Sequence, residues 1–598
     1  SANLPPMREH PEDRPAPLTL RVLATTDIHM HLTGWDARTN ATSPDHGFAR
    51  LASVIRDARA TAPGPVVLLD NGDSLQGTPH GEAARDMSER HPWAALLDAM
   101  GYDAMGLGNH DFDYGLEALA ACCAATDVPI LSASAVPAPR HVAPHVILER
   151  VVAGTAQPLR IGVTSVLPPQ TLIWNHAHLT GRLTFRDGVE AAADAVATLR
   201  AGGADVIVVL CHSGLSDTAE QGDENFARAL AAHVPGVDTM ILGHTHERFP
   251  DAAHDHLDDV DASNGTVSGV PAAMPGFAGA LLAQIDLHLS HQDGAWCVAG
   301  HDVRLRDLAQ AEPDPEATRL SAPCIAAPRA RMQAHVGHTA HEFHNYFGML
   351  HTGTADAILA RSMGDSIATA VAGTELAHLP LLVATSPYTM GGRAGPEHFV
   401  SVAKGPLRAR HIAMISPYEN TVWAQRMTGA DLRAYLETSA QFFGPGPDAD
   451  TPLVAPAAPA FNFDMLHGLH ARFDPFAPVG ARLVSLSREG TPVADDAPFL
   501  VAVTSYRGAG GGGFPGTGGA AAVQTDVSVV DALRTHLAAH QIGAQRAPSV
   551  WSFATSTKTS VTIETNPRAE AHLDEIAHHG PQPLGLTDAG FLKVRVTL

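Results

Sequence analysis

Cysteine, aromatic residues and positive charge are all scarce in this chain of 598 residues. Only 5 cysteines are present, and because no CxxC pair occurs, neither a disulfide scaffold nor a structural zinc knot is indicated. The 39 basic residues are outnumbered by 63 acidic ones, and the net charge of −24 argues against binding to a nucleic acid polymer. No stretch approaches about 18 consecutive apolar residues, so no membrane-spanning helix is expected.

Histidine and apolar residues, by contrast, are plentiful. There are 35 histidines, and 45% of the residues are hydrophobic, which fits a globular chain with substantial cores. At about 150 residues per domain, the length predicts roughly four domains, or two or three large ones. The chain starts Ser1-Ala2-Asn3 without a charged and apolar leader, so we expect either a signal peptide that has been removed or none.

The first half of the chain has the pattern of a layered α/β fold. From Leu18 to about Arg306, short apolar runs alternate with longer amphipathic or Ala-rich stretches. Five of these runs end in polar residues: Leu18 to Thr25, Val66 to Leu69, Ala104 to Leu107, Val206 to Leu210 and Thr239 to Leu242. Because ligands of such folds bind beyond the carboxyl ends of the strands, we expect the five ends to converge on one site.

The polar residues at the five strand ends share the chemistry of ligands for hard to borderline divalent metals. They are Asp27, His29, Asp70, Asn109, His212, His244 and His246. Two ions about 3.5–4 Å apart need a bridging carboxylate and about three further ligands each, and this inventory fits two ions. An amide ligand such as Asn109 adds no charge, which keeps the site cationic enough for an anionic substrate.

Each piece of this pattern has an ordinary explanation when taken alone. A single histidine in so His-rich a chain is more often a satisfied polar or surface residue than a ligand. The segment Asp70-Asn71-Gly72-Asp73 by itself fits a plain turn. Five such pieces in order, each at a predicted strand end, are poorly explained as turns, so we interpret them as one metal site.

The same motifs resemble a known family, the secreted 5'-nucleotidases with their calcineurin-like metallophosphoesterase core. The matching segments are Thr26-Asp27-Ile28-His29, Gly72-Asp73-Ser74-Leu75-Gln76-Gly77, Gly108-Asn109-His110-Asp111, His212-Ser213-Gly214 and Gly243-His244-Thr245-His246, continued by Tyr418-Glu419-Asn420, Phe461-Asn462-Phe463-Asp464 and Tyr506-Arg507-Gly508. Leu167-Pro168-Pro169 with Trp174, Ser386 to Arg393 and Phe461 to Gly468 are similar to a branch whose members hydrolyse 2',3'-cyclic nucleotides. The resemblance covers nearly the whole chain.

The resemblance implies an α/β protein in three parts. A four-layer αββα metallophosphoesterase domain is expected over residues 16–309, a helical linker over 310–345, and a C-terminal α/β nucleotide-binding domain of 5'-nucleotidase type over 346–598. Pro323 and Pro328 would interrupt the helical linker. The family also implies a periplasmic or secreted monomer that acts on small-molecule nucleotides, not on a nucleic acid polymer and not at a membrane.

The resemblance further assigns a role to each site residue. Asp27, His29 and His246 would hold one divalent ion, Asn109, His212 and His244 a second, and Asp70 would bridge the two. Mn, Co, Zn or Fe would all suit such ligands. His110 would lie over the phosphate and neutralise charge or protonate the departing ribose oxygen, and Asp113 would orient it.

The second domain is expected to hold the nucleoside. By resemblance, Tyr418 and Tyr506 sandwich the nucleobase, Asn420 hydrogen-bonds the base, and Arg393 binds the phosphate. The glycine run at Gly510 to Gly513 lacks the Gly-Lys-Ser/Thr ending of a nucleotide phosphate loop. It fits a backbone that passes close to the ribose or base beside Tyr506.

The implied reaction is hydrolysis of 2',3'-cyclic nucleotides to 3'-nucleotides, and then of 3'-nucleotides to nucleosides and phosphate, for scavenging. Two other functions stay open on these residues. One is a different hydrolase on the same scaffold, either a 5'-nucleotidase with nucleotide-sugar hydrolase activity or a sulfur-ester hydrolase. The other is a catalytically silent nucleotide-binding protein, against which the complete ligand set and His110 argue, because binding alone requires neither.

Overall fold

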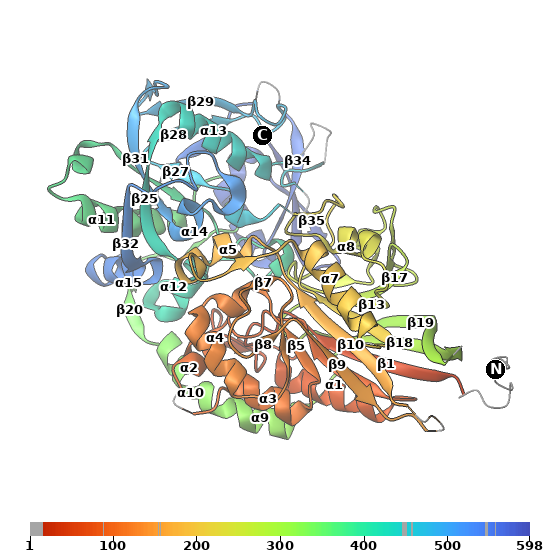
Figure 1. Ribbon diagram of the computed structural model, residues 1–598. Helices are drawn as coiled ribbons and strands as arrows, with labels where there is room; N and C mark the ends of the chain where they lie inside the picture. The colour runs from red at the N-terminus through yellow and green to blue at the C-terminus, as the bar shows by residue number, and fades with distance from the viewer. Residues whose placement is uncertain are drawn as a thin grey trace, which may run out of the picture. The chain divides into compact units, whose positions relative to one another are not determined.

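The computed structural model describes residues 16–598 except 88, 154, 156, 293, 445–450, 456–457, 544–547 and 556–557. The chain divides into two compact units, one that ends at Arg329 and one that runs from Ala330 to Leu598 (Figure 1).

Two β-sheets form the centre of the first unit. One has the strand order β19-β18-β1-β4-β5-β6-β8, and the other has the order β15-β16-β17-β13-β12-β10-β9. Strands β1, β4, β5, β6 and β8 run parallel in the first sheet, as do β10, β12, β13 and β17 in the second. The bounds are β1 Leu18–Thr25, β4 Val66–Asp70, β5 Ala104–Gly106, β6 Ile130–Leu131, β8 Val142–Ala143, β9 His145–Arg150, β10 Leu159–Val166, β12 Val206–Cys211, β13 Thr239–Leu242, β15 Val260–Asp261, β16 Thr266–Val267, β17 Val270–Pro275, β18 Leu281–Gln292 and β19 Ala295–Asp307.

Helices cover the outer face of each sheet. In Figure 1, α7 (Gly188–Ala201) and α8 (Ala227–His233) lie on the opposite side of β9 and β10 from α1 (Phe48–Ala60) and α3 (Pro92–Met100). One apolar cluster joins α1, α3 and α4 (Gly115–Ala124) to the first sheet, a second joins α7 and α8 to the other sheet, and a third fills the space between the sheets. The four-layer αββα architecture predicted from the sequence is confirmed.

Local sequence explains these elements. Helix α1 buries Phe48, Leu51, Ala52 and Ile55, which are spaced so that they share one face of a helix. Helix α7 begins after Asp187, whose carboxylate accepts hydrogen bonds from the backbone N–H groups of Val189 and Glu190 at 3.0 Å each. N–H groups in the first turn have no acceptor within the helix, so this cap stabilises its start. Strand β12 is buried at every position, as expected for a parallel strand covered on both faces.

The predicted linker is helical only in its first part. Helices α9 (Pro315–Ser321) and α10 (Ala326–Met332) flank a short 3₁₀ turn, and α9 packs against α1 and α3 within the first unit, where Arg56 binds Asp314 at 2.6 Å. The chain then enters strand β20 (His335–Thr339), which pairs with β24 (Gly405–Arg408). That pairing partner is distant in the sequence, so local pattern alone did not reveal the strand.

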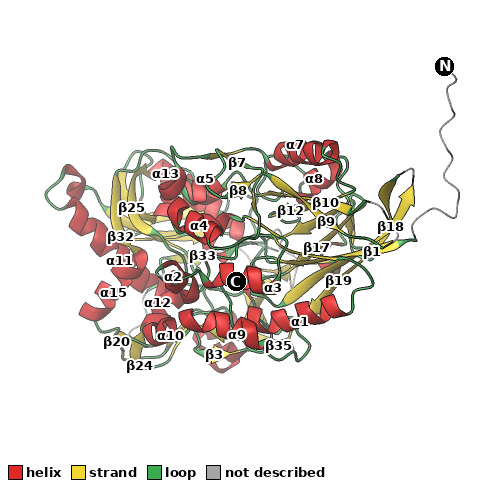
Figure 2. Cartoon of the chain, turned by 60° about the horizontal axis from the view of Figure 1, so that its bottom comes forward, coloured by secondary structure: helices red, strands yellow, loops and turns green. Residues whose placement is uncertain are grey.

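The second unit contains a five-stranded sheet of order β27-β22-β31-β25-β32. Helices α11 (Thr354–Val371) and α15 (Val529–Ala539) lie side by side against it and share one apolar cluster with it (Figures 1 and 2). A second cluster includes α13 (Gly429–Ser439) and alternate residues of the same strands. The strand bounds are β22 Leu381–Thr385, β25 Thr421–Thr428, β27 Met465–His467, β31 Pro498–Thr504 and β32 Val523–Ser528.

Two four-stranded sheets also belong to this unit. Their orders are β26-β34-β36-β35 and β30-β29-β28-β33. A 3₁₀ segment, η10 (Pro567–His579), follows β34 (Ser560–Thr565) and precedes β35 (Gln582–Leu586) and β36 (Leu592–Thr597). The other bounds are β26 Thr451–Pro452, β28 His470–Phe473, β29 Leu483–Arg488, β30 Thr491–Pro492 and β33 Trp551–Phe553.

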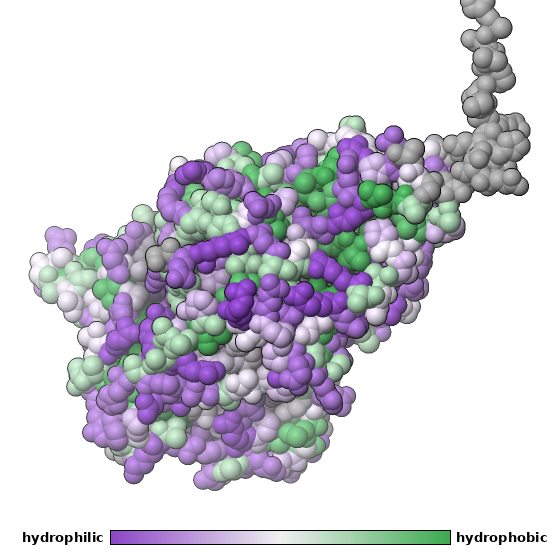
Figure 3. Space-filling model, turned by 90° about the horizontal axis from the view of Figure 1, so that it is seen from below, coloured by the Kyte–Doolittle hydropathy of each residue, from purple (hydrophilic) through white to green (hydrophobic). Residues whose placement is uncertain are grey.

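The surface carries a mixture of residue types. On the face drawn in Figure 3, hydrophilic and hydrophobic residues are interspersed. Among the described residues, no helix combines the length and the apolar character that a membrane crossing requires.

Candidate active site

The five predicted strands are present, and their carboxyl ends carry the predicted side chains. Strands β1, β4 and β5 supply residues from the first sheet, and β12 and β13 supply residues from the second. The backbone there is unusual, because Asp27, His29, Asp73, His244 and His246 have φ values of 51°, 48°, 54°, 72° and 59°. Left-handed torsions are costly for residues other than glycine and concentrate at functional sites. The fold therefore holds these five side chains in directions that a regular strand or helix would not give them.

The first group of candidate ligands consists of Asp27, His29 and His246. Nε2 of His29 lies 3.0 Å from Nε2 of His246, and Oδ1 of Asp27 lies 3.7 Å and 3.4 Å from these two nitrogens. The other ring nitrogen of His29, Nδ1, donates to the carbonyl of Gln76 at 2.8 Å, so Nε2 is left with its lone pair toward the group. A carbonyl behind a histidine in this way is the usual support of a metal ligand.

The second group consists of Asp73, His212 and His244. Nδ1 of His212 donates to the carbonyl of Asn71 at 2.7 Å, which again turns Nε2 inward. Asn109 joins this group, since its Oδ1 lies 2.9 Å from Nδ1 of His244. Nε2 of His212 and Oδ2 of Asp73 are buried without a hydrogen-bond partner among the described residues. Orphaned buried acceptors are costly, and a cation between them would satisfy both, so the donor set fits divalent metals.

Aspartate 73, which the sequence reasoning left out of the ligand set, lies between the two groups. Its Oδ2 is 3.0 Å from Nε2 of His212 and 3.8 Å from Nε2 of His29. The histidines offset the effect of burial, which by itself would raise the pKa, and hold the pKa of Asp73 well below its usual range. A carboxylate between two groups of ligands is the position of a bridging ligand.

Aspartate 70, the predicted bridging residue, is not brought into either group. It accepts hydrogen bonds from Thr25 Oγ1 at 2.6 Å, Ser74 Oγ at 2.8 Å and the backbone N–H of Gly72 at 3.0 Å. Burial raises its pKa to about 7 despite these hydrogen bonds. Asp70 is the last residue of β4 and faces its own turn, whereas Gly72, at φ 87°, reverses the chain so that Asp73 faces the other ligands. The structure thus corrects the prediction that Asp70 is a ligand.

Asp111, to which the sequence pattern gave no role, holds two ligand loops together. Its carboxylate accepts four backbone N–H groups, those of Asp73, Ser74, Leu75 and Gly108, at 2.8–3.0 Å. Burial and the nearby Asp73 raise its pKa to about 6. Because these donors belong to the loops after β4 and β5, Asp111 fixes the spacing between Asp73 and Asn109. The motif Gly108-Asn109-His110-Asp111 contained this residue, but its partners appear only in the fold.

Histidine 110 and Asp113 form the predicted pair. Nδ1 of His110 donates to Oδ2 of Asp113 at 2.7 Å, and the His110 ring centroid lies 5.2 Å from that of His29. Burial would lower the pKa of His110, but Asp113 and Asp73 outweigh it and raise that pKa to about 10. These carboxylates favour the protonated imidazole, and Nε2, the ring nitrogen that Asp113 does not hold, lies at the opposite side of the ring from this hydrogen bond.

In the second unit, the two tyrosines predicted to hold the nucleobase have different surroundings. Tyr418 is 36% exposed, and its ring lies 5.7 Å from Tyr388 and 6.3 Å from Phe461 between centroids. Tyr506 lies on α14 (Ser505–Gly508), and a Cβ atom added to Gly511 would come within 2.5 Å of its ring. Gly511 therefore leaves room for Tyr506, which explains part of the glycine run.

The two polar residues predicted to bind substrate differ in their surroundings. Oδ1 of Asn420 already accepts the backbone N–H of Tyr506 at 3.0 Å and the hydroxyl of Ser505 at 3.2 Å, so Asn420 positions Tyr506. Arg393 is exposed on a 3₁₀ turn, η6 (Gly392–Ala394). The residue after Tyr506, Arg507, is buried and binds both oxygens of Asp464 at 2.8–2.9 Å. This bidentate ion pair fixes the segment that carries Tyr506.

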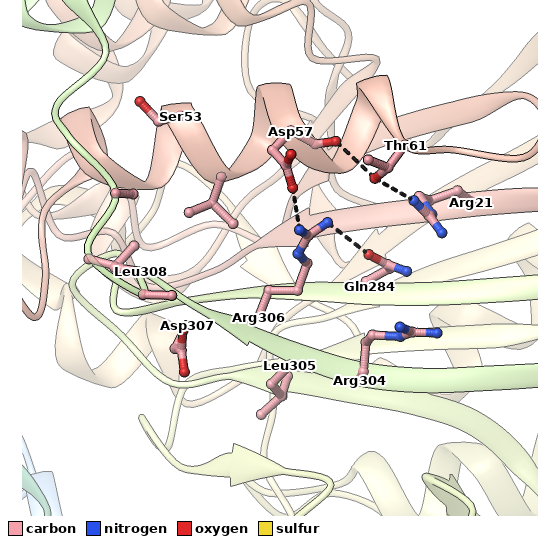
Figure 4. A pocket seen from close by; sticks show the side chains of 13 residues that line it. Arg21, Ser53, Asp57, Thr61, Gln284, Arg304, Leu305, Arg306, Asp307 and Leu308 are labelled. Atoms are coloured by element: carbon pink, nitrogen blue, oxygen red, sulfur yellow. Dashed lines mark hydrogen bonds and ion pairs between the residues drawn. The ribbon is translucent and has the colours of Figure 1, made fainter.

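Another hollow in the first unit lies among β1, α1, β18 and β19 (Figure 4). Two of its arginines are paired: Arg306 with Asp57 and with Gln284, and Arg21 with Asp286 at 2.7 Å. None of its lining residues belongs to either group of candidate ligands.

Comparisons with known proteins agree with this geometry. Residues 20–248 match the calcineurin-like phosphoesterase family, and residues 346–518 match the 5'-nucleotidase C-terminal domain. The 2',3'-cyclic-nucleotide 2'-phosphodiesterase/3'-nucleotidase of Haemophilus influenzae is 32% identical, over 97% of this chain and 95% of that protein. The trifunctional nucleotide phosphoesterase YfkN of Bacillus subtilis is 30% identical over 96% of this chain, which spans 41% of the length of YfkN. The crystal structure of a 5'-nucleotidase precursor from Thermus thermophilus shares the fold, with a TM-score of 0.65, 21% identity, and 90% and 100% of the two chains covered.

The fold and the site together define a calcineurin-like phosphoesterase that carries a 5'-nucleotidase C-terminal domain. The predicted fold class and the predicted hydrolase class are confirmed. More narrowly, the chain belongs to the family of 2',3'-cyclic-nucleotide 2'-phosphodiesterase/3'-nucleotidases.

Proposed function

We propose that this protein hydrolyses 2',3'-cyclic nucleotides to 3'-nucleotides, and 3'-nucleotides to nucleosides and phosphate, with two divalent metal ions. The observation that carries the proposal is the pair of ligand groups on either side of Asp73, next to His110 and Asp113. Similarity to the Haemophilus influenzae enzyme over nearly all of both chains supports the choice of substrate.

The residues of the first unit would bind the two metal ions. Asp27, His29 and His246 would hold one ion, Asn109, His212 and His244 the other, and Asp73 would take the bridging position predicted for Asp70. Ions bound there supply the Lewis-acid charge that offsets the negative phosphoryl group. Mn, Co, Zn and Fe all suit this mixture of carboxylate, amide and imidazole.

Histidine 110 would act on the substrate directly. Asp113 holds its Nδ1, so Nε2 is the nitrogen that would donate a hydrogen bond to a phosphoryl oxygen or a proton to the departing ribose oxygen. Cleavage of the bond from phosphorus to O2' of the cyclic ester leaves the phosphate on O3'. The resulting monoester would then lose phosphate at the same residues.

In the second unit, Tyr418 and Tyr506 would hold the nucleobase by stacking. Stacking tolerates any base at about 1–3 kcal/mol each, so we expect a broad base preference. Asn420 would contribute by positioning Tyr506, and Arg393 would contact the phosphate. We further propose that the protein is a monomer that acts in the periplasm or outside the cell, as the family resemblance implies; cell fractionation and light scattering test these two points.

The decisive experiment compares hydrolysis of 2',3'-cAMP, 3'-AMP and 5'-AMP by one preparation with added Mn²⁺. The proposal predicts turnover of the first two and little of the third. Preference for 5'-AMP with the cyclic ester untouched would instead identify a 5'-nucleotidase. Metal-loaded protein that turns over none of the three would identify a silent nucleotide-binding protein.

A further inference from the structure

A second cluster of metal-ligating side chains lies in the second unit. His344 ends strand β21 (Phe343–His344), and His572 and Glu575 lie three residues apart on η10. One ligand atom from each of the three falls within 4.8 Å of the others. His344 and Glu575 are 231 positions apart in the sequence, so no local sequence motif predicts the cluster.

The spacing of the ligand atoms suits one tetrahedral ion. Nε2 of His344 lies 2.9 Å from Oε1 of Glu575, and Nδ1 of His572 lies 3.4 Å from the same oxygen. Zinc bonds of about 2.0–2.2 Å at tetrahedral angles place neighbouring ligand atoms roughly 3.3–3.5 Å apart. The two distances to Oε1 of Glu575 thus lie within about half an ångström of this spacing, and the two histidine rings are 4.4 Å apart between centroids.

The surroundings of both histidines favour ligation. The His344 ring is 5% exposed and stacks on Tyr346, with centroids 4.1 Å apart and planes at 13°. Tyr346 is itself fixed by a hydrogen bond from its hydroxyl to Ser401 at 2.8 Å. Behind His572, Nε2 lies 3.7 Å from Oε1 of Glu342. At this distance Glu342 makes no direct hydrogen bond to His572, but its negative charge favours a cation bound there.

Charge and access complete the argument. Two neutral imidazoles and the Glu575 carboxylate offer one negative charge to a divalent ion, and Glu342 adds a second from behind. His572 and Glu575 are 24% and 29% exposed, so an ion could enter from solvent and keep one position for water. Two histidines with one glutamate and a water form a well-known zinc ligand set.

We propose that His344, His572 and Glu575 form a mononuclear Zn²⁺ site that clamps η10 to β21 within the second unit. The site shares no residue with the phosphoesterase groups: all of its ligands lie beyond Ala330, and all of theirs lie before Arg329. The ion would cross-link two segments that a hydrogen bond from His344 to Glu575 also joins. A bound ion would stabilise the second unit without taking part in hydrolysis.

Zinc stoichiometry of the full chain tests the site. Apoprotein dialysed against Zn²⁺ is analysed for bound metal in the wild type, H572A, E575Q and, as a matched control, H578A, whose exposed histidine lies on the same segment. We expect H572A and E575Q to bind one equivalent less than the wild type, and H578A to bind the same number. Equal stoichiometry in all four proteins would overturn the proposal.

Two further measurements separate loss of the site from loss of folding. Phosphoesterase activity of the fully loaded H572A and E575Q proteins should match the wild type, because neither residue belongs to the catalytic groups. Added Zn²⁺ should raise the unfolding temperature of the wild type and H578A more than that of H572A and E575Q. If H572A does not fold, E575Q, which keeps the side-chain volume, still decides, and an unchanged zinc count and thermal shift in it would refute the site.

Discussion

Oδ2 of Asp73 lies 3.0 Å from Nε2 of His212, an ion-pair distance, yet neither buried atom makes a well-aligned hydrogen bond among the described residues. Two acceptors facing each other in this way are costly in an apolar interior unless a cation or a proton lies between them. Their relationship is the strongest structural argument for metal binding in the first unit. It also separates Asp73 from Asp70, whose oxygens are already satisfied by donors.

Replacing the two aspartates separately should therefore give different results. We expect D73N to lose metal and to lower turnover of 2',3'-cAMP on the order of 10³-fold or more, because a bridging carboxylate cannot be replaced by an amide. D70N should keep its metal and lose only about 10–100-fold, as is usual for residues that support ligands. Metal analysis and kcat on the same preparations check this. Metal loss in D70N with a normal content in D73N would restore Asp70 as the bridge.

The His110–Asp113 pair predicts a dependence on the leaving group. H110A should lower kcat for 3'-AMP about 10²–10⁴-fold, the usual contribution of a general acid. The loss should be clearly smaller for 4-nitrophenyl phosphate, because its phenolate departs without a proton. D113N should show the same ordering with smaller losses. Equal losses on both substrates would show that His110 neutralises phosphate charge and does not protonate the leaving oxygen.

Tyrosine 418 should act on binding of the base. Removing one stacking ring costs about 1–3 kcal/mol, so Y418A should raise the KM for 3'-AMP roughly 5–150-fold. Y418F keeps the ring and should resemble the wild type. For ribose 3-phosphate, which has no base, Y418A and the wild type should have the same KM. A KM increase of equal size on ribose 3-phosphate would mean that the substitution disturbs the fold and not the stacking.

Aspartate 356 makes the stability of the second unit depend on pH. Its carboxylate is 3% exposed and accepts the backbone N–H of Gly353 at 3.1 Å, at the start of α11. Burial raises its pKa to about 6, although this hydrogen bond opposes the shift. The folded chain thus keeps a proton that the unfolded chain releases near pH 4, so this contribution is complete at low pH and is lost as pH rises to about 6.

The variant D356N lacks this titration and serves as the reference. Between pH 4 and pH 6.5, the free energy of unfolding of the wild type should fall relative to D356N by at most about 3 kcal/mol, and the difference should then stay level up to pH 8. Urea unfolding of both proteins across this range measures it. A difference that does not change with pH would contradict the raised pKa.

Most of the site could be read from the sequence because its ligands follow strands. The runs before Asp27, Asn109, His212 and His244 are apolar, and the polar residue after each run is conspicuous. The choice between Asp70 and Asp73 could not be read in this way, because it depends on the torsion angles of Gly72 and Asp73. Asp70 ends the strand and so fits the pattern better, whereas Asp73 reaches the other ligands through a left-handed turn.

The features that the sequence did not predict depend on contacts between residues that are distant in the chain. The four N–H groups on Asp111 come from two separate loops, and strand β20 needs β24, which follows α11 in the chain. The same holds for His344 and Glu575. Sequence spacing predicts which residues share a helix face or a strand end, but it does not predict which loops the packing of two sheets will bring together.

Five of the candidate ligand residues adopt left-handed backbone torsions, each of which costs on the order of 1–3 kcal/mol. Packing elsewhere in the unit must offset this free energy, and the apolar layer between the two sheets lies directly beneath the strands that carry these loops. The packing of the core thus keeps the ligand loops in strained backbone conformations. A loosened contact in that layer, such as a cavity at Leu69, would therefore relax the loops first and appear in an assay as weakened metal affinity before it appears as unfolding.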